Sequence, residues 1–318
     1  MTFHLFLPQM RMPVEAIVDR ALAAEAAGFE GIALMDHLAP PMAAQHDMWE
    51  AMTAAAWLLA RTRSLVVGHL VLCDPLRHPA VLARQATTLD RASGGRFELG
   101  IGWGSVPDEL DTFGVGAAPP RERVARLGES LDVMRALWTG EPVTYDGRYF
   151  RLRDAQQRPA PTRPIPIVVG GVGDRTLELV RAHADWWNVP IHALDRLDER
   201  RDRVGNARVS AQVMVALVQA EADRAAVTEL VARRFGGSVI GDTTVVGTTD
   251  ELAAHFGALR SRGVERFYVW FADFAPPETL RRFGEVIEAV EGVVPSSTAR
   301  QWVPFGRARG TGFRIRYT

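Results

Sequence analysis

The chain contains no lysine, because all 37 of its basic residues are arginine. This absence excludes a Schiff-base lysine, a P-loop lysine on a phosphate and a carbamylated lysine between two metal ions. Cysteine is almost as scarce, with Cys73 as its single occurrence. Neither an internal disulfide nor a cysteine-rich metal cluster can therefore form.

Long apolar runs are missing too, so the sequence predicts no membrane-spanning helix. The first ten residues lack the basic start and the cleavage site of a signal peptide. The 38 acidic residues nearly balance the basic ones and give a net charge of −1, which indicates no nucleic acid partner. With 47% hydrophobic and 24% charged residues, the chain is typical of soluble globular proteins, and we expect it in the cytoplasm.

Eight predicted strands alternate with helices along the chain. The strands are expected at 3–8, 31–35, 65–72, 97–101, 165–169, 186–189, 209–218 and 267–271. This order favours an α/β fold whose parallel sheet closes as a (β/α)8 TIM barrel with insertion loops at the C-terminal mouth. A doubly wound open sheet is the alternative, but it requires a glycine-rich turn after the first strand, where residues 8–11 read Pro-Gln-Met-Arg.

Two segments depart from this alternation. Residues 141–164 are expected as an insertion in a barrel of residues 1–291, and Asp146-Gly147 predicts a hairpin turn between two short strands there. Residues 292–318 carry arginines among glycines and short apolar pieces. We expect them to form an irregular tail without a catalytic role.

A glycine-rich strand end is the first candidate binding feature. In the segment 96–105, RFELGIGWGS, apolar residues alternate with glycines at 100, 102 and 104. A strand face of glycine leaves room for a flat ligand against the backbone, although small residues can also merely allow close packing. Trp103, Gly104 and Ser105 follow where the strand opens into a loop, which is the end at which such barrels bind ligands.

A second candidate follows the fifth predicted strand. The turn Gly170-Gly171-Val172-Gly173 leads directly into a helix, whose free N–H groups and dipole can hold a phosphate. Arg175 and Thr176 can add a charge and a hydroxyl donor. The alternative is a tight turn capped by Asp174, whose charge would repel an anion unless the side chain points away.

Polar and aromatic residues lie at the other strand ends. Asp36 and His37 end the second strand, where a carboxylate beside an imidazole can orient it for proton transfer. His69 and Leu70 lie on the third strand, and periodicity leaves open whether the imidazole faces the mouth or the core. The remaining candidates, which could stack on a flat ring or belong to the core, are Trp187, Asn188 and Trp270.

These motifs together resemble the luciferase-like monooxygenase superfamily, which includes FMN-dependent monooxygenases and deazaflavin-dependent oxidoreductases. The similarity extends over residues 2–291. It is carried by LFLPQ at 5–9, DH at 36–37, PIPIVVGG at 164–171 and above all by RHPAVLARQATTLDRASGGRFELGIG at 77–102.

The resemblance implies a reduced cofactor, either FMN or the deazaflavin coenzyme F420, with a slight preference for F420. It implies that residues 170–176 bind the cofactor phosphate and that the ring lies in the barrel mouth. It places Asp36 and His37 near the reactive ring, and residues 69–70 where the deazaflavin branch often has a non-prolyl cis peptide. Ser105 departs from the pattern, because some deazaflavin enzymes have a glutamate acid there.

We therefore expect an oxidoreductase that transfers hydride to, or oxygenates, a small and largely apolar substrate. His37 is the expected acid–base group, oriented by Asp36, and the lack of lysine speaks against sugar phosphates. An FMN enzyme would need a separate reductase, because no nicotinamide fingerprint is present, and the resemblance implies a homodimer. A metal-dependent barrel hydrolase and a non-catalytic flavin-binding protein are the alternatives.

Overall fold

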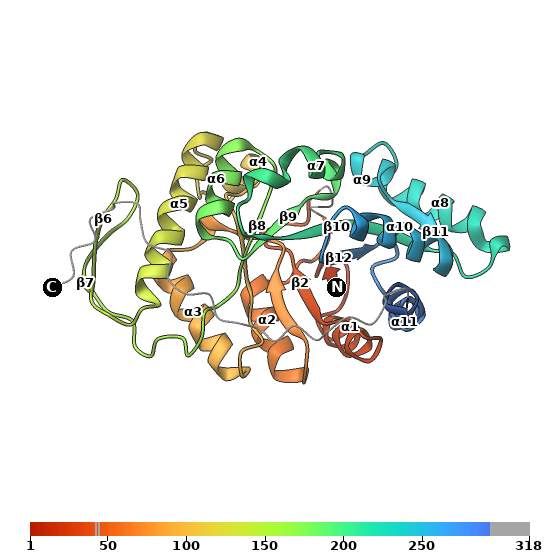
Figure 1. Ribbon diagram of the computed structural model, residues 1–318, viewed down its shortest axis with the longest axis horizontal. Helices are drawn as coiled ribbons and strands as arrows, with labels where there is room; N and C mark the ends of the chain where they lie inside the picture. The colour runs from red at the N-terminus through yellow and green to blue at the C-terminus, as the bar shows by residue number, and fades with distance from the viewer. Residues whose placement is uncertain (42, 44, 293–318) are drawn as a thin grey trace.

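The computed structural model describes residues 1–41, 43 and 45–292, which form a parallel barrel surrounded by helices (Figure 1). The strands are β1 Thr2–Leu7, β2 Gly31–Leu34, β3 Val66–His69, β4 Leu72–Cys73, β5 Leu99–Gly102, β6 Val143–Asp146, β7 Arg151–Ala155, β8 Ile167–Gly170, β9 Trp186–Val189, β10 Arg208–Leu217, β11 Val245–Gly247 and β12 Arg266–Phe271. The α-helices are α1 Glu15–Ala26, α2 Ala51–Arg61, α3 Pro79–Ala92, α4 Pro107–Thr112, α5 Pro120–Leu137, α6 Asp174–His183, α7 Leu197–Arg200, α8 Arg224–Phe235, α9 Val239–Asp242, α10 Thr249–Ser261 and α11 Pro277–Gly292. Short 3-10 turns include η1 Asp74–Leu76, η2 Ile191–Arg196, η3 Arg201–Arg203 and η4 Glu221–Asp223.

The barrel closes through a strand that is split in two. β1 lies between β2 and β12, and the sheet continues from β12 through β10, β9, β8 and β5 to β4. β3 pairs with β2, whereas β4 follows β3 after two residues and pairs with β5. A parallel bridge between Val67 and Phe97 joins the remaining gap. The predicted (β/α)8 barrel is thus confirmed, with β3 and β4 together as its third strand.

A cluster of phenylalanines holds α10 and α11 against the barrel. Phe3 on β1 contacts Phe256 of α10 and Phe283 of α11 edge-on, with ring centroids 5.2 and 5.9 Å apart. Phe267 on the neighbouring strand β12 lies 4.8 Å from Phe256. All four rings are at most 1% exposed. Burial of this apolar area, at about 25 cal/mol per Å², attaches the outer helices to the outward-facing side chains of the strands.

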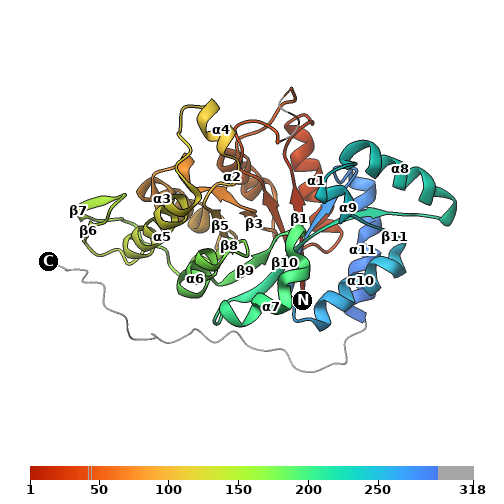
Figure 2. The same cartoon turned by 90° about the horizontal axis from the view of Figure 1, so that it is seen from above.

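Two additions extend the barrel and occupy opposite ends of the molecule in both views (Figures 1 and 2). At one end, β6 and β7 pair as an antiparallel hairpin in the predicted insertion. At the other end, β10 continues for ten residues and pairs with the short strand β11, beside α8. β11 and α9 lie in residues 236–248, a segment rich in glycine and threonine, which predicts a loop between two helices expected at 222–235 and 249–262. That prediction was wrong, because the strand is defined by its pairing with a distant partner.

The predicted irregular tail lies, from residue 293 onward, outside the described residues. Within the ranges that are described, we find no helix with the length and apolar character needed to cross a membrane. The site described below is built entirely by the barrel and its loops.

A buried ion pair fills the amino-terminal end of the barrel. Glu98, just before β5, accepts hydrogen bonds from Arg266 at 2.6 Å and from the hydroxyl of Tyr268 at 2.9 Å. The guanidinium also lies over the ring of Trp186, 3.8 Å from its centroid. Burial opposes the charge of Arg266, but Glu98 and Tyr268 outweigh it and raise the pKa of Arg266 above its ordinary value.

Glu98→Gln is therefore expected to destabilise the fold strongly. The substitution leaves the guanidinium of Arg266, 8% exposed, without a counter-charge inside the barrel. Breaking a buried pair by removing one partner costs about 3 kcal/mol or more. Urea unfolding measures this loss, and the double variant Glu98→Gln/Arg266→Met is the control, since it removes both charges and should recover part of the stability. A loss below about 1 kcal/mol in the single variant would contradict the assignment.

Candidate active site

Residues from six barrel strands, or from the loops that directly follow them, surround a cavity of about 410 Å³. Gly102 and Gly171 both line it, so the two glycine features singled out in the sequence share one cavity. The predicted site residues in its wall are Asp36, His37, Leu70, Trp103, Gly104, Ser105, Gly170, Gly171, Val172, Gly173, Thr176 and Asn188. A cavity at the carboxyl ends of the strands is where barrels of this type bind ligands.

The glycine face of β5 lies against strand three. A Cβ at Gly100 would clash with the carbonyl oxygen of His69, and a Cβ at Gly102 would lie 2.6 Å from Cγ2 of Val71. Gly104, at φ +79°, would place a Cβ 2.9 Å from Sγ of Cys73. The sequence prediction that these glycines make room for a ligand thus needs correction, because they first accommodate the neighbouring strand.

The peptide bond between Leu70 and Val71 is cis, directly between β3 and β4. The resemblance implies a non-prolyl cis bond in this part of strand three, and the structure confirms it one residue beyond the 69–70 position. Leu70 and Val71 both line the cavity. The bond therefore lies in the cavity wall, close to the glycines of β5.

The turn before α6 leaves the backbone N–H groups at the start of the helix without a side-chain cap. Its N-cap residue Gly173 makes no side-chain hydrogen bond, and Gly171 adopts φ +124°, a conformation that favours glycine. The carboxylate of Asp174 points away from the turn, because it accepts hydrogen bonds from Arg200 at 2.7 Å and from Arg203. The objection that Asp174 would repel an anion is thereby removed, and the N–H groups and helix dipole are suited to a phosphate.

His37 is paired with a glutamate from α4. Its Nδ1 lies 2.8 Å from Oε2 of Glu109, and both residues line the cavity. The other oxygen of Glu109 accepts the backbone N–H groups of Leu38 at 2.5 Å and Ala39 at 3.1 Å. An ionised carboxylate can only accept, so Nδ1 carries the hydrogen and Nε2 is left as the proton acceptor.

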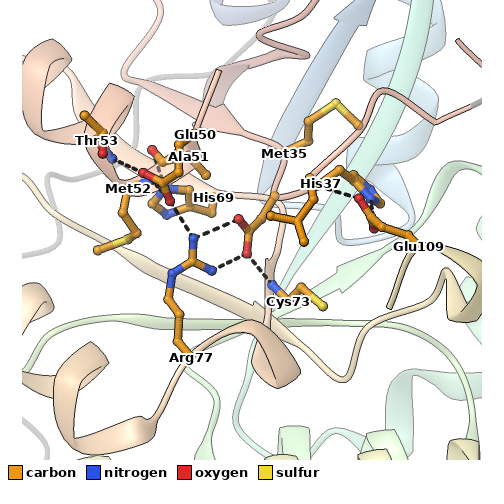
Figure 3. A network of polar contacts seen from close by, with 12 residues as sticks. Met35, His37, Glu50, Ala51, Met52, Thr53, His69, Cys73, Arg77 and Glu109 are labelled. Atoms are coloured by element: carbon orange, nitrogen blue, oxygen red, sulfur yellow. Dashed lines mark hydrogen bonds and ion pairs between the residues drawn. The ribbon is translucent and has the colours of Figure 1, made fainter. Parts of the chain in front are cut away.

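Asp36 does not orient His37 as the sequence suggests, because its carboxylate is engaged elsewhere. It accepts hydrogen bonds from Arg77 at 2.5 and 2.9 Å and from the backbone N–H of Cys73 at 2.8 Å. Arg77 also donates to Glu50 at 2.6 Å. Figure 3 shows Arg77 and Glu50 on one side of this network and the His37–Glu109 pair on the other. Asp36 thus holds Arg77 and the N–H of Cys73, and Glu109 is the residue that orients the imidazole of His37.

Glu50 links this anchor to helix α2. Its carboxylate caps the helix by accepting from the N–H groups of Met52 at 3.1 Å and Thr53 at 2.6 Å. Burial opposes the charged form, but the hydrogen bonds from Thr53, Met52 and Arg77 outweigh it and lower the pKa of Glu50 to about 2. Glu50 therefore stays ionised at neutral pH, and the network joins the end of β2 to α2 and to strand three.

Four predicted site residues lie away from the cavity wall. His69 is 1% exposed and contacts the carbonyl oxygen of Ala51, 3.2 Å away, and Arg175 lies exposed on α6. Trp187 is fully buried and donates its indole N–H to the carbonyl oxygen of Gly171 at 2.7 Å, so it supports the anion turn from behind. Trp270 packs between the rings of Phe6 and Phe235.

The sequence analysis does not predict several of the residues that line the cavity. Glu109 lies in the first turn of α4, and Pro107 marks the start of this helix in the sequence. No sequence pattern near Glu109 predicts that it pairs with His37. Gln212, in the middle of β10, and His192, in η2, also line the cavity. Asn188 accepts from the hydroxyl of Ser210 at 3.3 Å, which leaves its amide N–H groups free to donate. In the described part of the chain, no group of three or more metal-ligating side chains is assembled.

The buried imidazole of His69 makes stability depend on pH. Burial lowers the pKa of His69 to about 4. As the pH falls below the ordinary histidine value of about 6.5, the unfolded chain takes up the proton first and the folded state loses stability. Between pH 7 and 5 this loss is about 2 kcal/mol, and His69→Gln should remove it. Urea unfolding of both proteins at the two pH values measures the difference, and parallel losses would contradict the assignment.

Comparison with known proteins identifies a family and several relatives for this chain. The family model described as luciferase-like monooxygenase matches residues 1–239. The F420-dependent glucose-6-phosphate dehydrogenase of Nakamurella multipartita is 37% identical over 173 residues, which cover 53% of this chain and 50% of that protein. The enzyme of the same name from Microbacterium testaceum is 36% identical over 167 residues, 51% of this chain and 48% of that protein. The chain thus spans about half the length of the curated relatives it matches.

Solved structures show the same fold at low sequence identity. An F420-dependent secondary alcohol dehydrogenase in complex with an F420-acetone adduct has a TM-score of 0.81 at 19% identity and covers 91% of this chain and 98% of that one. EDTA monooxygenase from Chelativorans has a TM-score of 0.78 at 15% identity and covers 93% and 95%. Because the family match extends over more than half of the chain, this protein belongs to the luciferase-like monooxygenase family.

Proposed function

We propose that the chain is an oxidoreductase that uses coenzyme F420 to transfer hydride to or from a small organic substrate. The observation that carries this proposal is the single cavity that contains both the open amide turn before α6 and the His37–Glu109 pair. The names of the curated relatives support F420, and those relatives are dehydrogenases. The metal-dependent hydrolase has no comparable support from the described residues or from the relatives.

The residues present fit a phosphorylated cofactor with a flat ring. Gly173 and Thr176 would hold the phosphate, since no side chain caps the N–H groups at the start of α6, whereas the N–H of Gly171 donates to the carbonyl oxygen of Asn188 at 3.1 Å and fixes the turn. Trp103, Gly104 and the Leu70–Val71 segment would border the ring. When bound, a reduced or oxidised deazaflavin supplies or accepts a hydride.

His37 is arranged to move a proton at Nε2. Glu109 holds the Nδ1–H tautomer, which leaves Nε2 free to act as a base. For an alcohol substrate, Nε2 accepts the hydroxyl proton as the carbonyl forms, and in the reverse direction it returns the proton to the carbonyl oxygen. Glu109 stabilises the imidazolium at Nδ1 in either case.

Reduced FMN is a second candidate cofactor, because the family is described by its monooxygenases. It would occupy the same phosphate turn and would activate oxygen for insertion into the substrate. Such an enzyme would depend on a separate reductase to supply the reduced flavin. Fluorescence titration of the full chain with F420 and with FMN distinguishes the two, and no binding of either at micromolar concentration would contradict both.

His37→Ala is expected to lower kcat/KM by about 100-fold or more, the usual contribution of a general acid–base group. Glu109→Gln should lower kcat with little change in KM, because it loosens the tautomer of His37 without removing a substrate contact. The ¹⁵N spectrum of His37 should then change from a pure Nδ1–H form to a mixture. Asp108→Asn, on the neighbouring exposed position of α4, is the matched control and should change neither value. A decrease below tenfold in His37→Ala would overturn the assignment.

Gly173→Asp separates phosphate binding from stability. Gly173 has φ −72° and ψ 145°, which any residue adopts, and an aspartate there would cap α6 and stabilise the fold by roughly a few tenths of a kcal/mol. The same carboxylate would occupy the amide turn and repel a phosphate. We expect at least a tenfold loss of cofactor affinity by fluorescence titration, with an unchanged or raised melting temperature. Gly173→Asn, an uncharged cap, should lose less affinity, and equal affinity in all three proteins would place the phosphate elsewhere.

A further inference from the structure

The guanidinium of Arg123, near the start of α5, is buried without a counter-charge. Arg123 is 4% exposed, and its Nε and Nη1 have no hydrogen-bond acceptor in the described part of the chain. Glu122, its neighbour in sequence, pairs with Arg148 at 3.5 Å. Asp74 pairs with Arg126, one turn further along α5. A buried charge is costly unless it is paired, so the unused N–H groups of Arg123 indicate an anion beside them.

Arg123 contacts a residue of the cavity wall. Its Cζ lies over the ring of Trp103, 5.0 Å from the ring centroid. Trp103 follows β5 and lines the cavity together with Gly173 and Thr176 at the start of α6. A guanidinium over an aromatic ring keeps the N–H groups at its edge able to donate to oxygen atoms. Arg123 therefore lies directly beside the cavity that contains the anion turn.

The register of two neighbouring helices places Arg123 at the level of this turn. α5 and α6 run side by side in the same direction, since each follows one of the paired parallel strands β5 and β8 (Figures 1 and 2). A Cβ at Gly128 would lie 3.1 Å from Cδ2 of Leu179. Arg123 and Asp174, the first residue of α6, each lie five residues before this contact. Because side chains on a helix tilt toward its N-terminus, the guanidinium reaches the level of the turn that precedes Asp174.

Two sets of unused donors thus lie at the same level of the barrel. Asp174 does not supply the missing negative charge, because its carboxylate pairs with Arg200 at 2.7 Å and with Arg203. The N–H groups at the start of α6 and those of Arg123 are therefore available together. A phosphate group has several oxygens that can accept from both sets, and the full charge of an arginine adds to the partial charge of the helix start.

We propose that Arg123 supplies the counter-charge of the anion site at the start of α6, and that this site binds a phosphate ester between the guanidinium and the helix N–H groups. The identity of the ester as F420 or FMN rests on the proposed function, whereas the anion contact does not depend on the cofactor ring. Arg123 lies outside both segments, 96–105 and 170–176, that the sequence marks as binding features. Its role follows from its burial and from the register of α5 against α6.

A cycle of variants tests the position of the guanidinium without any ligand. Gly173→Asp puts a carboxylate at the start of α6, where it would pair with Arg123. We expect Gly173→Asp to raise the melting temperature by about 2 °C more in the native background than in Arg123→Met. Gly173→Asn, a cap without charge, should have the same effect in both backgrounds. Equal gains from Gly173→Asp in the two backgrounds would overturn the assignment.

Inorganic phosphate tests the anion site in the full chain without cofactor. Millimolar phosphate should raise the melting temperature of the native protein, with sodium chloride at equal ionic strength as the reference. Arg123→Met should lose this response, whereas Arg123→Lys, which keeps the charge, should retain part of it. Arg121→Met, at an exposed position of the same helix, is the matched control and should respond as the native protein does. An equal response in Arg123→Met, or none in the native protein, would contradict the proposal.

FMN and riboflavin connect this site to the cofactor, because they share one ring system and differ by the phosphate. We expect Arg123→Met to weaken binding of F420 or FMN by about tenfold or more and to leave binding of riboflavin unchanged. If Arg123 controls the response to phosphate but neither cofactor binds, the inference stands and the proposed function fails. If F420 binds and turns over equally well in the native protein and in Arg123→Met, the inference fails and the proposed function stands.

Discussion

The close approach of strand three to the glycine face of β5 determines the shape of the barrel mouth. Alternate residues of strand three, from His69 to Cys73, each lie against one glycine of the neighbouring strand. A side chain at Gly100 or Gly102 would push strand three away from β5, where it pairs over two residues only. Leu70 and Val71, between the two halves of strand three, can form part of the cavity wall because β5 has no Cβ atoms at positions 100 and 102.

That approach also organises the charges below the cavity. The N–H of Cys73 reaches Asp36 because strand three lies close to both of its neighbours. Asp36 in turn holds Arg77, and Arg77 holds Glu50, which caps α2. Burial and the carboxylate of Asp36 raise the pKa of the Cys73 thiol to about 12, so the thiol in the cavity wall stays protonated. The network thus gives the mouth a rigid base, while the proton-transfer pair lies on the other side.

The sequence predicts the barrel and much of its cavity, because both depend on local patterns. Apolar alternation marks the strands, and the segments 96–105 and 170–176 combine glycine with a strand end. The partner of His37 could not be predicted, since Glu109 lies 72 residues away and Asp36 is the neighbour in sequence. The burial of His69 and Trp187 away from the cavity could not be predicted either, because both faces of a buried parallel strand are apolar and alternation does not tell them apart. The alternating glycines of β5 are visible in the sequence, but their contact with strand three depends on the fold.

Asp36 and His37 are consecutive in the extended chain after β2, and they serve opposite sides of it. Asp36 binds Arg77 on one side, and His37 faces the cavity on the other. The positions of these two residues along the chain are therefore as important as their identities. Removal or addition of one residue ahead of the pair would exchange the two faces and direct the carboxylate into the cavity and the imidazole at Arg77. Loop-length variation in descendants of this chain should therefore be tolerated after Ala39 and selected against before Asp36.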